Sequence, residues 1–357
     1  MLKYLSSWSS VGPVLAWAVI AAVSMGFASV LLIAIALAAA VTSAVHHAEI
    51  IAHRVGEPFG TLILALAVTV IEVGLILSLM AGADDGAATL ARDTVIAAVM
   101  IILNGIIGIC LLIGGIFHRE QVFQQSGVSA ALATICALTI LSLVLPNFTV
   151  SEAGPVYSSE QLAFVAIISL ILYGTFVTVQ TVRHREYFLQ PEPVAENEDN
   201  LSHRPSRIKA GISAAFLIAA LGAVVLLAKE LSQPLDQMVI SIGAPNAIVG
   251  IMIAALVLLP EGVAAVRAAL RNRIQTSLNL ALGSALATIG LTIPAVSVLS
   301  LLADLPVALG LGAKGTVLLS LTLLVSTLSL ANGRTTVLQG VVHLVIFGVY
   351  IFTTVFP

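Results

Sequence analysis

The chain has 357 residues, of which 59% are hydrophobic and 9% are charged, and its mean hydropathy is +1.10. A soluble domain carries roughly a quarter charged residues, so this composition could not cover the surface of a water-soluble fold of this length. The net charge of −3 gives no basic face for nucleic acid. The apolar residues occur in long runs, and about 20 such residues span a bilayer. We therefore expect an all-α, polytopic membrane protein.

Charged and turn-forming clusters divide the apolar sequence into about eleven predicted transmembrane helices. The first runs into further apolar sequence without a clear small-residue cleavage site, so we interpret it as a helix and not as a cleaved signal. The predicted spans lie near residues 11–25, 28–46, 60–81, 94–117, 127–146, 160–182, 208–229, 240–266, 276–302, 314–331 and 336–356.

Lysines and arginines alternate across these spans in a way that predicts the topology. With the N-terminus in the cytoplasm, the outside loops hold Arg92, Lys229 and Lys314, and the other twelve of the 15 basic residues fall on cytoplasmic segments. Cytoplasmic loops of membrane proteins carry such an excess of positive charge. We therefore predict that the N-terminus is cytoplasmic and that the C-terminus lies outside.

The longest polar segment, residues 183–207, divides the predicted helices into six and five. Its acidic middle could collect cations, although a solvated linker explains it more simply. We predict an extra N-terminal helix at 1–27, a five-helix repeat at 28–182, the cytoplasmic linker at 183–207 and a second five-helix repeat at 208–357. The two repeats would have opposite topology, and transporters built this way bind substrate near the midplane between their repeats.

Each predicted repeat contains one span with a single carboxylate near its middle. Glu72 lies in TLILALAVTVIEVGLILSLM and Glu261 in AIVGIMIAALVLLPEGVAAV. An ionised group at mid-membrane costs about 2.5–3.5 kcal/mol on insertion scales, and no lysine or arginine lies within either core span to offset it. Two carboxylates brought together would also repel, and a metal cation or protons would relieve that repulsion. We therefore predict that Glu72 and Glu261 bind metal cations and protons in turn.

Further oxygen ligands are expected, because a hard cation such as Ca²⁺ takes about six to eight of them. Thr69 lies three residues before Glu72, on the same helical face. Pro260 precedes Glu261, and a proline inside a helix frees the carbonyl near Leu256. Other candidates lie in the helix that follows in each half, where small polar residues also serve helix packing: Asn104, Ser284 and Thr288.

Five segments, in order from about residue 41 to the last helix, resemble a known family. Two contain the glutamates: HHAEIIAHRVGEPFGTLILALAVTVIEV and LLPEGVAAVRAALRNRIQTSLNLALGSALATIGLTIPAV. The others read GGIFHREQVFQ, LILYGTFVTVQTVRHREYF and NGRTTVLQGVVHL. Together they resemble the calcium/cation antiporter superfamily, in its proton-exchanging CAX branch and in particular the bacterial ChaA-type antiporters.

The resemblance implies a ten-helix core of two inverted repeats in a bacterial inner membrane, exchanging cytoplasmic Ca²⁺ for external protons. It would make Glu72 and Glu261 the cation and proton carriers. Val68-Thr69 and Val257-Leu258 replace the Gly-Asn pairs usual in CAX repeats, and Gln339 stands where plant and fungal relatives often carry an acid. Fewer side-chain oxygens leave room for Na⁺ or K⁺ as the cation. We expect no bound cofactor beyond the transported ions.

Two histidine features suggest alternatives. His46, Glu49 and His53 have i, i+3, i+7 spacing, so one helix face could present a metal site of an intramembrane metalloenzyme. Polar residues at a helix end near the headgroups explain them more simply. His343, inside the last span, could titrate near neutral pH or serve as a hydrogen-bonded packing residue.

A passive cation channel is the remaining alternative function. An acidic pair could line a pore. One copy of each acid, however, does not form the ring of charges usual in a selectivity filter.

Overall fold

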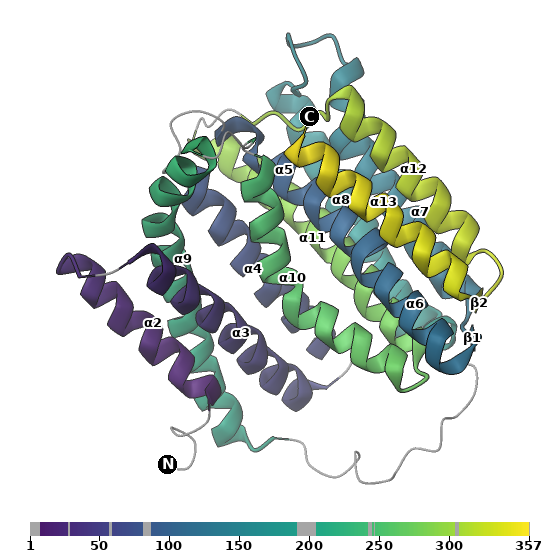
Figure 1. Ribbon diagram of the computed structural model, residues 1–357, viewed down its shortest axis with the longest axis horizontal. Coiled ribbons are helices and arrows are strands. Elements are labelled where there is room, and N and C mark those ends of the chain that lie inside the picture. The colour runs from purple at the N-terminus through teal and green to yellow at the C-terminus, as the bar shows by residue number, and fades with distance from the viewer. Residues whose placement is uncertain are drawn as a thin grey trace. The chain divides into compact units, whose positions relative to one another are not determined.

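The computed structural model describes residues 8–27, 29–56, 59–80, 87–190, 205–241, 245, 247–303 and 307–356 (Figure 1). Within these residues, nine helices are long and apolar enough to cross a membrane, and two shorter apolar segments lie at Val11–Ser24 and Leu66–Ile76. The secondary structure is helical apart from two strands of two residues each. The prediction of an all-α, polytopic protein with about eleven helices is confirmed.

The outward faces of these helices are apolar, as a bilayer requires. Leu302 is 79% exposed, Ile208 76% and Ile218 70%, and many other large apolar side chains are exposed as well. In water, apolar surface on this scale would drive aggregation or association, whereas lipid tails solvate it. The chain is therefore a multi-pass membrane protein.

The chain forms two compact units, and the helices of each unit contact one another. Unit 1 comprises Met1–Ala87 and Asn197–Asn246, and unit 2 comprises Ala88–Glu196 and Ala247–Pro357. The division into inverted five-helix repeats stays a prediction.

The described residues of unit 1 form four helices, in which α3 packs against each of the other three. Small residues allow these helices to approach closely: a methyl group on Gly12 would lie 2.9 Å from the backbone oxygen of Ala39. The indole Nε1 of Trp17 donates to the Ala219 carbonyl at 3.0 Å, which joins the first helix to the last. The helices are α2 (Trp8–Ser24), α3 (Val30–Val55), α4 (Phe59–Met80) and α9 (Arg207–Ser241).

Unit 2 contains the remaining helices, several of which are continuous with short π- or 3₁₀-helical segments. Its α-helices are α5 (Ala87–Met100), α6 (Ile107–His118), α7 (Gln125–Thr139), α8 (Ser159–Thr178), α10 (Ala247–Leu270), α11 (Ile274–Ala303), α12 (Ala313–Leu330) and α13 (Val337–Val355). The π-helical segments are η1 (Ile101–Ile106), η2 (Ile140–Val144) and η4 (Val179–Arg183), and the 3₁₀ segments are η3 (Leu145–Phe148) and η5 (Arg185–Phe188). Figure 1 shows α13, in yellow, alongside α6, in blue, and the two helices are in contact.

Two helix boundaries differ from those predicted. The predicted break between residues 229 and 240 is wrong, because α9 continues through Pro234 to Ser241. Lys229 and Glu230, which indicated the break, are exposed polar residues on a helix that continues. Likewise α3 continues past residue 46 to Val55 and ends at Gly56, whose φ of 81° suits glycine. Charged residues mark where a helix leaves the apolar layer, and they do not terminate it.

A short antiparallel ladder joins the turn after α6 to the turn before α13. Strand β1 (Gln121–Val122) pairs with β2 (Arg334–Thr335), in the register Gln121 to Thr335 and Val122 to Arg334. The ladder brings GGIFHREQVFQ and NGRTTVLQGVVHL side by side, although these segments lie far apart in the sequence.

Candidate transport site

Glu72 lies in the described middle of α4, among apolar residues. Its side chain is 2% exposed, and its neighbours Ile71 and Ile76 are fully buried. Thr69, one turn earlier on the same face, is also buried. Helix α4 contains no lysine or arginine. Burying an ionised carboxylate is costly unless it is paired or coordinated, and the role of Glu72 in binding a proton or a cation stays a prediction.

Glu261 lies on α10 of unit 2 and is half-buried. Pro260 is inside the helix, where its ring nitrogen cannot donate to the carbonyl of Leu256 four residues earlier. Arg267, in the last turn of α10, is the one basic residue of this helix. A carboxylate and a freed carbonyl therefore lie within about one turn of each other, as a cation site would require.

The π-helical segment η1 packs against α10 close to Glu261. A methyl group on Gly262 would lie 3.2 Å from Cδ1 of Ile106, the last residue of η1. Asn104 belongs to the same segment and is fully buried. Helix α11 also packs against both α10 and η1, and it carries the half-buried Ser284 and the buried Thr288. The structure thus places Pro260, Glu261 and these three predicted ligands on neighbouring elements of unit 2.

The side chain of Asn104 is held at both ends by residues of other helices. Its Nδ2 donates to Oγ1 of Thr322 on α12 at 2.8 Å, and its Oδ1 lies 3.3 Å from Nδ1 of His343 on α13. Oγ1 of Thr322 lies 3.4 Å from the sulfur of Met100. Asn104 is therefore the centre of a buried polar cluster, and its role as a cation ligand stays a prediction. Thr322 was not among the predicted residues, because its only signal in the sequence is a hydroxyl in an apolar span.

The metalloenzyme alternative gains no support from the described residues. Nδ1 of His46 lies 3.9 Å from Oε2 of Glu49, and His53 is exposed. The neighbouring His47 is buried and stacks on Phe216 with ring centroids 5.2 Å apart. In the part of the chain that the structure describes, no three His, Cys, Asp or Glu side chains are grouped to hold a metal ion.

A polar network ties the turn between α10 and α11 to the segment after α6. Gln121 donates through Nε2 to the Ala269 carbonyl at 3.1 Å and to Oδ1 of Asn272 at 2.9 Å. The backbone N–H of Gln124 donates to Oε1 of Gln275 at 2.6 Å. These bonds hold the end of the Glu261 helix, because Ala269 belongs to its last turn.

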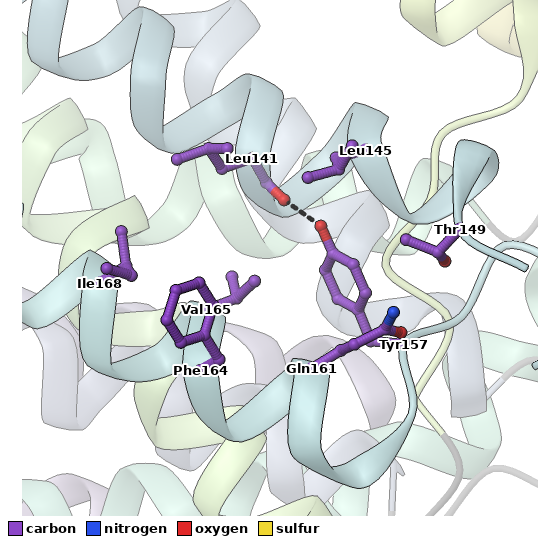
Figure 2. A pocket seen from close by; sticks show the side chains of 8 residues that line it. All are labelled: Leu141, Leu145, Thr149, Tyr157, Gln161, Phe164, Val165 and Ile168. Atoms are coloured by element: carbon purple, nitrogen blue, oxygen red, sulfur yellow. Dashed lines mark hydrogen bonds between the residues drawn. The ribbon is translucent and has the colours of Figure 1, made fainter. Parts of the chain in front are cut away.

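An apolar cavity of about 150 Å³ lies elsewhere in unit 2, between the segments η2 and η3 and the start of α8 (Figure 2). The Tyr157 hydroxyl donates to the Leu141 carbonyl across it, and burial raises the pKa of Tyr157 to about 12. Its other lining residues are Leu145, Thr149, Gln161, Phe164, Val165 and Ile168. None of the predicted ligands lines this cavity.

Comparison with known proteins identifies the class. The family described as sodium/calcium exchanger protein matches residues 14–182 and 212–356, so the chain belongs to this family of membrane exchangers. The chain is 51% identical over 321 residues to the putative ionic transporter y4hA of Sinorhizobium fredii, covering 90% of this chain and 87% of that protein. It is 37% identical over 324 residues to the sodium-potassium/proton antiporter ChaA of Escherichia coli, with the same coverage of 90% and 87%.

Solved structures support the fold. Native YfkE superposes with a TM-score of 0.74 at 16% identity, covering 98% of this chain and 99% of that one. The H⁺/Ca²⁺ exchanger CAX superposes with a TM-score of 0.70 at 16% identity, covering 96% and 87%. At these identities the likeness shows a shared polytopic all-α fold.

Proposed function

We propose that the chain is a secondary active antiporter that exchanges a cytoplasmic cation for external protons, with Glu72 and Glu261 as the shared carriers. The observation that carries the proposal is the burial of Glu72, at 2% exposure, in an apolar helix without a basic residue. A carboxyl in such a place is favourable when it is protonated or when it coordinates a cation. Alternation between these two states is the chemistry of exchange.

Alternating access supplies the mechanism. Facing outward, the two carboxyls take protons; facing the cytoplasm, they release the protons and bind the cation. The protonated or cation-bound site is electrically neutral or nearly so, whereas the empty, ionised site carries buried negative charge, which is costly. The protein therefore changes least readily between its outward-facing and inward-facing states when the site is empty. This couples the cation flux to the proton flux. Thr69, Ser284, Thr288 and the carbonyl freed by Pro260 supply further oxygens.

We propose Na⁺ or K⁺ as the first candidate cation. The relative that is 37% identical over 90% of this chain is named as a sodium-potassium/proton antiporter. The Gly-Asn pairs are replaced at Val68-Thr69 and Val257-Leu258, and the Asn104 amide is engaged within its own cluster. These features leave fewer side-chain oxygens than the six to eight that Ca²⁺ takes.

Ca²⁺ is the second candidate, and a specific observation favours it. Two carboxylates match the charge of a divalent ion, and a Ca²⁺/H⁺ antiporter of Aphanothece halophytica is 24% identical over 82% of this chain. For either cation we propose a bacterial inner membrane, with the N-terminus cytoplasmic and the C-terminus outside.

Everted membrane vesicles with an imposed pH gradient and a pH-sensitive dye test the proposal. Na⁺, K⁺ and Ca²⁺ are added in turn, and the transported cation dissipates the gradient. Glu72→Gln and Glu261→Gln should each reduce this response to background while membrane insertion stays normal. Glu152→Gln, the same change at an exposed acid, is the matched control and should exchange like the wild type.

Cation flux without proton movement would show that the protein is a cation channel and not an antiporter. Near-normal exchange in either glutamine variant would remove that residue from its assigned role.

A further inference from the structure

Two rows of side chains wall the cavity of about 150 Å³ beside Tyr157 in unit 2 (Figure 2). One row has i, i+3, i+4, i+7 spacing on a single face of α8: Gln161, Phe164, Val165 and Ile168. The other row repeats every four residues along η2, η3 and the turn after them: Leu141, Leu145 and Thr149. The cavity thus lies between two regular helical surfaces.

A proline determines how Tyr157 is held at this cavity. In the π-helical segment η2, the N–H of Leu145 bonds to the carbonyl of Ile140, five residues earlier. The next bond of this kind would run from residue 146 to Leu141, but Pro146 has no N–H. The Tyr157 hydroxyl donates to the Leu141 carbonyl instead. This bond fixes the tyrosine ring against the wall of the cavity.

The polar side chains that line the cavity are engaged with other protein groups. Oγ1 of Thr149 donates to the Pro146 carbonyl at 3.1 Å. Oε1 of Gln161 accepts from the Ser158 N–H at 3.0 Å, and its Nε2 donates to Oγ of Ser151 at 3.1 Å. A water molecule needs two to four polar partners, and it would find few here. The cavity therefore suits an apolar occupant.

The size of the cavity and its opening fit a hydrocarbon chain. A cavity of about 150 Å³ lined by Leu, Ile and Phe stays dry and binds benzene, so this one has room for about six carbons of a chain. At its edge, Phe164 is 63% exposed and Leu145 is 39% exposed, on helices whose outward faces meet lipid. An empty void would deprive the walls of van der Waals contacts. An acyl chain from the bilayer can enter and fill it.

The cavity has a polar end and an apolar end. Figure 2 shows Thr149, Tyr157 and Gln161 toward one side and Ile168 toward the other. The polar end lies at the start of α8, and Ile168 is seven residues further along this membrane-spanning helix, or about 10 Å. Tyrosine is enriched at the level of the lipid headgroups. A phospholipid would therefore place its headgroup at the turn before α8 and its chain toward Ile168.

The charge at the polar end selects the headgroup. Residues 145–161 contain two glutamates and no lysine, arginine or histidine. Glu160, next to Gln161, is exposed, and its Oε2 accepts from the Ser158 hydroxyl at 2.9 Å. Ser158 and Gln161 form a capping box, which occupies N–H groups that a phosphate would need at the start of α8. An exposed carboxylate attracts an ammonium group and repels an acidic headgroup.

One basic side chain reaches this turn indirectly, and it is already paired. Arg92 donates through Nη1 to the carbonyl of Gly310 at 3.1 Å, and the N–H of Gly310 donates to the Pro155 carbonyl at 2.9 Å. Nε of Arg92 lies 2.8 Å from Oδ1 of Asp93. The positive charge of Arg92 is therefore offset by its neighbour, and the turn keeps its negative charge.

We propose that the cavity beside Tyr157 binds one phospholipid whose headgroup carries a free ammonium group, as phosphatidylethanolamine does. One acyl chain fills the space between α8 and the segments η2 and η3, and the ammonium group pairs with Glu160. This site goes beyond the proposed exchange function and does not depend on it. Its test measures bound lipid and not transport.

Native mass spectrometry of the delipidated, full-length protein in detergent tests the proposal. The protein is titrated with phosphatidylethanolamine or with phosphatidylglycerol of the same acyl chains. The wild type should retain one phosphatidylethanolamine and should prefer it to phosphatidylglycerol by up to about fivefold, as one exposed charge pair allows. Glu160→Gln should remove this preference, because glutamine keeps the shape of the side chain without its charge.

A second set of variants tests the cavity itself. Leu145→Trp places an indole at the opening and should abolish retention of the lipid. Leu170→Trp makes the same change at a position of α8 that is 48% exposed and does not line the cavity, and it should retain the lipid. Val165→Phe fills the cavity from the other wall and replaces the first variant if that one does not fold.

Three results would overturn the proposal. If Leu145→Trp and Val165→Phe retained lipid like the wild type, the lipid would bind elsewhere. If the wild type bound phosphatidylglycerol as tightly as phosphatidylethanolamine, the headgroup would not be selected by Glu160. If the wild type were a lipid-free dimer that Leu145→Trp converted to monomers, the cavity would belong to an interface between two copies of the chain.

Discussion

Nε2 of Gln121 lies 2.9 Å from Oδ1 of Asn272, across 151 residues of sequence. The same nitrogen donates to the carbonyl of Ala269 in the last turn of α10. The Ala269 carbonyl also accepts from the backbone N–H of Asn272 at 3.1 Å, so Gln121 adds a second donor at this helix end. Its side chain also fits against Gly114, where any β-carbon would overlap Oε1 of Gln121.

The first prediction removes this amide. Gln121→Met keeps the length of the side chain but removes its hydrogen bonds to the Ala269 carbonyl and to Oδ1 of Asn272, while the Ala269 carbonyl keeps the bond from the Asn272 N–H. We expect a loss of about 0.5–1.5 kcal/mol in stability for each hydrogen bond removed, because this is the usual net contribution of such a bond. Thermal unfolding in detergent measures the loss. Gln125→Met, at an exposed position, is the control and should unfold like the wild type.

The second prediction concerns the backbone of Asn272, whose φ is 58°. Asparagine and glycine tolerate this left-handed conformation, whereas leucine pays roughly 1–2 kcal/mol for it. Asn272→Leu should therefore be less stable than Asn272→Gly by about this amount, although both lose the bond to Gln121. Equal unfolding temperatures for the two variants would show that the backbone of this turn relaxes.

The apolar runs predicted nearly all the transmembrane helices, because each must be long enough to cross the membrane. They also singled out Glu72 and Glu261, since a carboxyl in an apolar helix is conspicuous in sequence. The misplaced break near residue 230 shows the limit of this reasoning: Lys229 and Glu230 mark the edge of the apolar layer, and helix α9 extends beyond it.

Features set by long-range contacts could not be predicted. The π-helical segment around Asn104 depends on i to i+5 bonding, which has no sequence pattern of its own. Its partners Thr322 and His343 lie 218 and 239 residues away. The two-residue ladder between β1 and β2 is too short for any alternation of apolar and polar residues to appear.

The third prediction is a pH dependence at Tyr157, which lies between α7 and α8. Its folded pKa of about 12 exceeds the ordinary tyrosine value of about 10. The folded state thus holds this proton more tightly than the unfolded state. The stability that results is fully present below about pH 10 and is lost as the pH rises through about 12.

Tyr157→Phe removes this titration. The difference in unfolding temperature between wild type and variant should be constant below about pH 10 and should shrink above it. Parallel curves up to about pH 12 would show that the Tyr157 hydroxyl ionises equally in both states. Absorbance of the tyrosinate form provides an independent measurement.

The last prediction uses two glycines of α13. A β-carbon on Gly340 would lie 2.4 Å from the backbone nitrogen and 2.7 Å from Cα of Leu112 on α6, and backbone atoms cannot move aside as a flexible side chain does. Gly340→Ala must therefore separate α6 from α13. Because His343 lies one turn after Gly340, this separation also lengthens the bond between His343 and Asn104. We expect a loss of about 1–3 kcal/mol, as in other overpacked interiors.

Gly348→Ala is the matched control on the same helix. A β-carbon there meets no atom within 4 Å, so alanine should leave stability unchanged or raise it by up to about 1 kcal/mol through its better helix propensity. The two variants make the same chemical change two turns apart, and opposite signs are expected in thermal unfolding. If Gly340→Ala unfolded like Gly348→Ala, helices α6 and α13 would not be in backbone contact, and the cluster that holds His343 would lose its rigid frame.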